Sequence, residues 1–153
     1  MTRHLCWPIL AFGALSACGI LESSLAAKDL TFEVREVDYW SPGPLRQIVL
    51  FVQGDTIYPC MNYEIESDLQ VQGRSIRVTM SGAIKTPQIC LTALGPAVFR
   101  AALGITDGSY TLDFVRRGVT DRYVLDVTQF AIEITPLQTH FTRPAARSFP
   151  RLG

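Results

Sequence analysis

Three acidic side chains, Glu64, Glu66 and Asp68, alternate along one stretch of the chain. On one face of a strand they could serve a carbohydrate hydrolase or hold a cation. A calcium site needs ligands that converge from a turn, whereas a strand face spreads them apart. We also expect Arg77 opposite Asp68 across a hairpin, as an ordinary cross-strand ion pair. The favoured interpretation is a solvated strand face, and a glycan-acting enzyme is the least favoured function.

Histidine is scarce in this chain, which limits acid–base catalysis. The sequence contains His4, near the N-terminus, and His140, in a segment rich in proline and arginine. A Ser-His-Asp or Cys-His arrangement therefore lacks its usual base within the expected domain. The sequence also contains no nucleophile elbow, phosphate-binding glycine loop or paired-histidine metal motif. We predict a protein that is not an enzyme and that uses neither a cofactor nor a metal.

The N-terminal residues have the pattern of a secretory signal. Arg3 and His4 precede the apolar run "LCWPILAFGAL", and a cationic start followed by roughly 7–15 apolar residues is typical of such signals. The run is interrupted by Pro8 and Gly13, and it is shorter than the roughly 20 apolar residues that a transmembrane helix needs. We predict that residues 1–17 form a helical signal peptide that is cleaved.

Cys18 ends the tetrapeptide Leu15-Ser16-Ala17-Cys18 at the close of this run. The tetrapeptide resembles the lipobox of bacterial lipoproteins, in which leucine, a small residue, and alanine or glycine precede an obligatory cysteine. The resemblance implies that the chain is cut before Cys18 and that its thiol is diacylated. Acyl chains contribute about 0.8 kcal/mol per buried methylene, so two of them attach a protein stably to a membrane.

Two alternatives remain for this N-terminus. The segment Ser24-Leu25-Ala26 fits an ordinary cleavage site that would release a soluble protein without Cys18, and residues 1–17 could instead stay as an uncleaved anchor. Gly19, in place of an aspartate after the cysteine, resembles lipoproteins sorted to the outer membrane. We therefore expect attachment to the bacterial cell envelope, on the outer membrane facing the periplasm where two membranes exist.

The remaining cysteines, Cys60 and Cys90, are left as one pair once residues 1–17 are removed and Cys18 is lipidated. Export to an oxidising compartment favours a disulfide between them. Closing such a loop stabilises a fold by roughly 3–4 kcal/mol. A zinc site is the alternative, but the pair lacks the neighbouring histidine or second cysteine pair that zinc spacing requires.

The charge balance excludes a strongly basic protein. Removal of residues 1–17 takes 17 from 153 residues and Arg3 from 14 basic residues, so 136 residues with 13 basic and 14 acidic side chains remain. This length corresponds to one domain. A nucleic-acid-binding domain would need a basic stripe, and we expect no nucleic-acid partner.

Most of the remaining chain alternates apolar and polar residues in short runs separated by turn residues, as strands do. Gly95-Pro96 interrupts the one stretch that could be helical, so the run after it is a strand or a short helix. The pattern predicts an all-β fold, an antiparallel sandwich or barrel of 8–9 short strands. The nine runs are residues 30–37, 46–53, 61–71, 74–82, 88–94, 97–103, 109–117, 121–129 and 130–137.

Within this pattern, "VQGR" and "RGVT" are expected to turn two hairpins. The segment "DGSYTL", residues 107–112, resembles the tyrosine corner of immunoglobulin-like sandwiches. The resemblance implies that Tyr110 bonds back to the backbone of the preceding turn. Leu112 stands where antibody domains place a second cysteine, and their core tryptophan has no clear counterpart, so the resemblance implies only a broad Ig-like sandwich. The expected domain spans residues 29–138, after a tether at 18–28.

Three surface features are candidate contacts. Tyr39 and Trp40 precede a Pro/Gly turn in "DYWSPGP" and could stack on a sugar or hold a partner; the alternative is that Trp40 caps the core. Residues 139–153 are expected to be a flexible basic tail that could lie against anionic headgroups. A partner strand could also add to an open sheet edge.

Together these patterns predict a lipid-anchored β-sandwich that acts as a non-catalytic interaction or structural module at the envelope. Its partners are expected to be the membrane, through the N-terminal lipid, and a protein or glycan. The alternative function is a small periplasmic inhibitor or a glycan- or ligand-binding domain that uses Tyr39 and Trp40.

Overall fold

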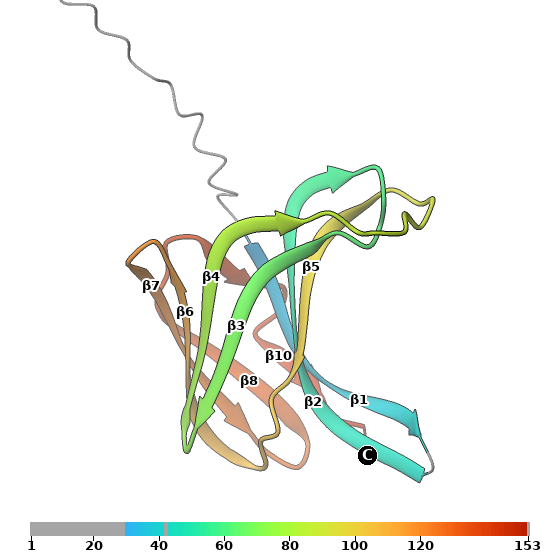
Figure 1. Cartoon of the computed structure of the whole chain (residues 1–153). Coiled ribbons are helices and arrows are strands. Elements are labelled where there is room, and N and C mark those ends of the chain that lie inside the picture. Colours follow the sequence, from blue (N-terminus) through green and yellow to red (C-terminus); the bar gives the residue numbers. More distant parts are fainter. Residues whose placement is uncertain (1–29, 42, 153) are drawn as a thin grey trace, which may run out of the picture.

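A computed structural model describes residues 30–41 and 43–152, although the side chains of residues 39–45 lie outside the description. The described residues form ten strands in a single sheet, ordered β10-β8-β7-β6-β4-β3-β5-β2-β1-β9. Figure 1 shows this sheet curled into a half-barrel. The strands are β1 (Leu30–Ser41), β2 (Gly43–Tyr58), β3 (Glu64–Gln72), β4 (Ser75–Lys85), β5 (Gly95–Ala102), β6 (Gly108–Arg116), β7 (Val119–Val127), β8 (Ala131–Gln138), β9 (Thr142–Pro144) and β10 (Ser148–Pro150).

The all-β prediction is confirmed, but the predicted antiparallel Ig-like sandwich is corrected by the structure. One mixed sheet is present, because β4 pairs with β6, β3 with β5 and β1 with β9 in parallel. No second sheet is needed to cover the core, because the long strands bend around it. Register shifts between Gln53 and Ile57 in β2, and between Ile65 and Ser67 in β3, mark two bends, as β-bulges increase local twist and curvature.

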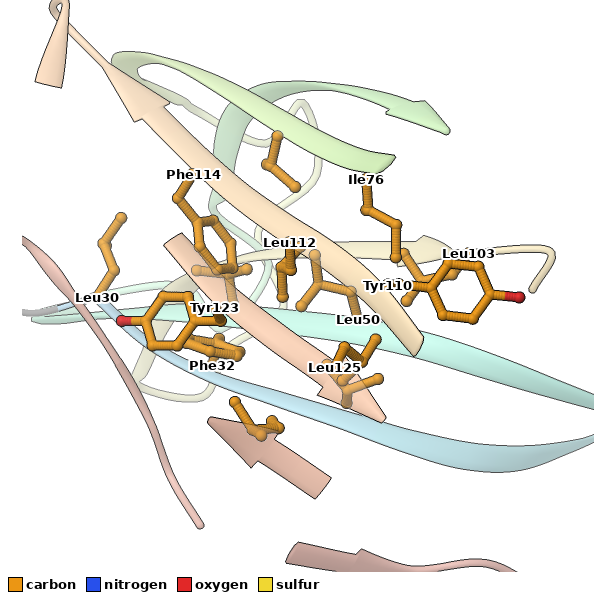
Figure 2. Packing of buried hydrophobic residues seen from close by; sticks show 14 of the residues in the cluster. Leu30, Phe32, Leu50, Ile76, Leu103, Tyr110, Leu112, Phe114, Tyr123 and Leu125 are labelled. Atoms are coloured by element: carbon orange, nitrogen blue, oxygen red, sulfur yellow. The ribbon is translucent and has the colours of Figure 1, made fainter. Parts of the chain in front are cut away.

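The core fills the inside of the curl. In β4 every second residue from Ile76 to Met80 is buried, as expected when alternate side chains point to opposite faces. Phe32, Phe114 and Tyr123 form an aromatic cluster at its centre (Figure 2), with ring centroids 4.8 to 6.0 Å apart. Such large buried side chains contribute most of the apolar area that stabilises the fold.

Both predicted hairpins are present. The β3–β4 hairpin turns at Gly73-Arg74, and the β6–β7 hairpin turns at Arg117-Gly118, where both residues have positive φ. Positive φ at both residues is the type I′ conformation, which is common in two-residue hairpin turns because it matches the twist of the strands. The predicted tyrosine bond is also present, since the Tyr110 hydroxyl donates to the Thr106 carbonyl at 3.0 Å.

Eight of the nine predicted strand runs correspond to β1–β8, and the exception is residues 88–94. This segment is an irregular loop in which Asn62 accepts a hydrogen bond from the Leu91 amide and donates one to the Ile89 carbonyl. Its backbone groups therefore bond to the neighbouring turn, not to a strand ladder. The following residues, 95–102, form strand β5 and not a short helix.

The sequence predicts a flexible basic tail at residues 139–153, beyond the last strand. The structure instead has two further strands there, β9 and β10. Phe141 and Thr142 are buried, β9 pairs with β1, and β10 pairs with β8. Since β9 and β10 are the two edges of the sheet, this segment connects both edges. These residues do not alternate apolar and polar side chains as β8 does. The sequence pattern therefore favours a tail over strands.

No helix long and apolar enough to cross a membrane occurs among the described residues. The predicted signal peptide at 1–17, Cys18 and the rest of the stretch before β1 lie outside the description.

Candidate functional site

One end of the curled sheet contains a cavity of about 440 Å³, here called the end cavity. Strand β1 begins there, β4 and β2 bend there, and the β6–β7 turn closes one side. Most of its lining side chains are apolar. They are Leu30, Tyr58, Ile65, Met80, Ile84, Ala97, Val119 and Phe141, with Gly54, Asp55, Thr56, Gly82, Arg116, Arg117 and His140 completing the wall.

Two glycines sit where the walls of the end cavity bend. Gly82 has φ +84 and nothing within 4 Å of a Cβ built on it, so the conformation, and not crowding, favours glycine there. It interrupts β4 at the register shift opposite Ile65 and Ser67. Gly54 lies in the corresponding shift of β2. Both strands therefore turn away from the core, which leaves the space that the cavity occupies.

A cationic group lies at the rim of this apolar space. Arg116 follows Leu112 and Phe114 in the inward-facing register of β6, so its side chain faces the cavity. Its guanidinium lies 4.3 Å from the centre of the Phe141 ring. Burial lowers the pKa of Arg116, and the charge of Arg117 lowers it further, while Asp121 raises it. A partly buried guanidinium beside a second cation favours an anionic neighbour.

The segment that carries His140 and Phe141 is fixed by a buried carboxylate. Asp121 accepts hydrogen bonds from the backbone amides of His140, Phe141 and Thr142 at 2.7, 2.9 and 2.6 Å. It also accepts one from the Thr142 hydroxyl at 2.6 Å. Tyr123 donates to the Thr142 carbonyl at 2.7 Å. These bonds hold one wall of the cavity in place, since charge-assisted hydrogen bonds are the strong ones.

The predicted acidic strand face lies outside the end cavity. Glu66 accepts a hydrogen bond from the Ser81 hydroxyl and lies 3.9 Å from Lys85. Asp68 accepts one from the Gln70 amide. Within residues 30–41 and 43–152, no three histidine, cysteine, aspartate or glutamate side chains gather as a metal site would require.

The predicted pair between Arg77 and Asp68 is wrong. Asp68 lies opposite Thr79, and Arg77 lies opposite Gln70. The Arg77 guanidinium is instead 4.0 Å from Asp113 on β6. The reason is the turn: the two-residue turn at Gly73-Arg74 sets a register two residues away from the expected one.

Tyr39 and Trp40 belong to strand β1, not to a loop. Their backbones pair with Leu45 and Pro44 of β2, at the opposite end of β1 from Leu30 and the end cavity. Their side chains lie outside the description. A sugar- or partner-binding role for them stays a prediction, separate from the cavity.

The predicted disulfide between Cys60 and Cys90 is present, with Cα atoms 5.3 Å apart. Cys18 lies outside the described residues, so its lipidation stays a prediction. Sequence reasoning missed the rim residues Arg116, Arg117 and His140. One signal was available, because two adjacent arginines before a turn glycine put one cation on the inner face of a strand.

No protein-family model matches this chain, and neither the curated proteins nor the solved structures contain a match.

Proposed function

We propose that the chain is an exported, lipid-anchored binding protein whose end cavity holds an amphipathic anion. The observation that carries the proposal is an apolar cavity with Arg116 and Arg117 at its rim. Ligand sites are typically apolar pockets of roughly 300–1,000 Å³ with a few placed polar groups. In this cavity an aliphatic chain would contact Ile65, Met80 and Ile84, and an acid group would lie beside the arginines.

The charges at the rim favour an acid over a neutral headgroup. Arg116 and Arg117 outnumber Asp55, which is the acidic lining residue. An anion at this position would accept a charge-assisted hydrogen bond from the partly buried Arg116 guanidinium. The exposed rim residues Ile84 and Val119 leave a route by which a chain can enter.

The envelope location in this proposal rests on Leu15-Ser16-Ala17-Cys18. Its test is mass spectrometry of the N-terminal peptide of protein purified from its native membrane. We expect a peptide that begins at Cys18 and carries acyl mass. A peptide that begins after Ala26, with no acyl mass, would contradict the anchor.

Calorimetric titration tests the ligand class. The full chain carrying Cys18→Ser is titrated with dodecanoate and with dodecanol, which differ in charge but share one aliphatic chain. We expect dodecanoate to bind roughly tenfold more tightly, because a charge-assisted hydrogen bond contributes about 1.5 kcal/mol or more. Arg116→Gln should remove this difference.

Arg100→Gln is the matched control, because Arg100 also lies over an aromatic ring, that of Phe51, but does not line the cavity. It should leave the preference for dodecanoate unchanged. Ile84→Trp, which fills the rim, should weaken both ligands. Equal binding of acid and alcohol to the unsubstituted cavity, or unchanged binding in Ile84→Trp, would refute the proposed ligand class.

A further inference from the structure

A second surface, here called the stapled tip, consists of residues 56–63 and 86–96. No aspartate, glutamate, lysine, arginine or histidine occurs in either segment. Five of its large apolar side chains are exposed, namely those of Ile57, Met61, Ile89, Leu91 and Leu94. Clusters of exposed apolar side chains mark surfaces that contact a partner or a membrane.

The exposure of the stapled tip is fixed by its covalent and hydrogen-bonded structure. The Cys60–Cys90 disulfide joins its two segments. Asn62 donates to the Ile89 carbonyl at 2.7 Å and accepts from the Leu91 amide at 3.2 Å. A Cβ on Gly95 would lie 3.0 Å from Met61, so the segments touch closely. The apolar side chains cannot fold inward without breaking these contacts.

The stapled tip lies at the same end of the molecule as the start of the described chain. Tyr58 of the tip and Leu30, the first described residue, line the same end cavity. Figure 1 shows the beginning of β1 and the β4–β5 loop at one end of the half-barrel. Eleven residues lie between Cys18 and Leu30, and such a length spans at most roughly 40 Å. An acyl anchor on Cys18 would therefore keep this end close to the bilayer.

We propose that the stapled tip docks on the lipid bilayer and inserts its apolar side chains among the headgroups and upper acyl chains. The orientation rests on the proposed lipid anchor, whereas the affinity comes from the tip itself. A protein interface usually has a rim of charged and polar side chains, and the tip has no charged ones. A bilayer requires only apolar area from a surface segment. The end cavity then faces the source of amphipathic molecules.

Tryptophan probes test this docking without an acyl group, on the full chain carrying Cys18→Ser and with the native Trp7 and Trp40 replaced by phenylalanine, so that each probe is the sole tryptophan. Leu94→Trp places a probe on the tip, and Phe130→Trp places one at an equally exposed site, since the two residues are 76% and 75% exposed. Strand β7 begins at Val119, which lines the cavity, and Phe130 follows the other end of this strand. The control site is therefore far from the cavity end. The probes are mixed with phosphatidylcholine vesicles, with and without brominated acyl chains.

We expect the emission of the Leu94→Trp chain to shift to the blue and to be quenched by the brominated lipid, with no change for Phe130→Trp. In a flotation assay, Ile89→Asp/Leu94→Asp should lower vesicle binding by roughly tenfold or more, and Phe130→Asp should not. Equal responses of both probes, or no response of either, would refute membrane docking, the second result leaving a protein partner for the tip. Because Cys18→Ser cannot be acylated and all the variants share residues 1–17, the difference between the tip variants and the Phe130 variants does not depend on the N-terminal anchor.

Discussion

At the scale of single residues, Asp121 links the C-terminal segment to the sheet. Its side chain is fully buried and accepts four hydrogen bonds from residues 140–142. A buried carboxylate is stable only when its oxygens are satisfied in this way. The bonds also fix Phe141, which lies under the Arg116 guanidinium at the cavity rim. Stability and the candidate site are therefore connected through one side chain.

We predict that Asp121→Asn lowers the free energy of unfolding by about 2 kcal/mol, because one accepting oxygen and the charge are lost. Denaturant titration followed by circular dichroism measures the effect. Asp126→Asn on the same strand is the control and should change stability by less than about 0.5 kcal/mol, since no hydrogen bond or ion pair is described for the Asp126 side chain. A loss no larger than that of the control would contradict the role given to Asp121.

At the scale of elements, the C-terminal segment joins the two edges of the sheet. Arg151, just after β10, donates to Glu36 of β1 at 2.8 Å and to the Thr128 carbonyl at 2.7 Å. It also pairs with Asp107, and the Leu152 amide donates to Glu36. Strand β9 pairs with β1 on the other side. Arg151, one of the arginines of the expected basic tail, therefore stabilises the folded sheet.

This clamp predicts a pH dependence. The Arg151 hydrogen bond lowers the pKa of Glu36 below 4.5, although burial opposes the shift. A lowered pKa in the folded state adds stability above the unfolded pKa and loses it as the pH falls through the folded one. We expect Arg151→Met to destabilise the protein by about 2 kcal/mol at neutral pH and the difference from the unsubstituted chain to shrink below pH 4.5. A difference independent of pH would contradict the Glu36 linkage.

Much of this element structure could be predicted from local patterns. The alternation of Ile76, Val78 and Met80, the glycine turns and the pair of cysteines are all local signals. Strand order is not local, because the parallel pairing of β4 with β6 depends on which long-range partner completes the curl. The same limit applies to the site. Arg116 and His140 are far apart in the sequence but line one cavity, and the bond from the His140 amide to Asp121 holds the C-terminal segment there.

At the scale of the whole molecule, the candidate functional features lie at one end of the half-barrel. The end cavity, its cationic rim and the stapled tip all lie there, close to Leu30. The opposite end carries the Arg151 contacts with Asp107 and Thr128. This polarity fits a protein held to a membrane through its N-terminal residues, with a ligand site that faces the bilayer.

Photolabelling tests whether the end cavity holds the aliphatic chain of an anionic ligand. The full chain carrying Cys18→Ser is irradiated with a fatty acid that bears a diazirine near the end of its chain, and the labelled peptides are sequenced by mass spectrometry. We expect label on cavity residues such as Met80 and Phe141, and we expect it to be competed by dodecanoate and lost in Ile84→Trp. Label on Phe130 or Leu137, which are exposed and outside the cavity, at the same level as in the cavity would contradict this expectation.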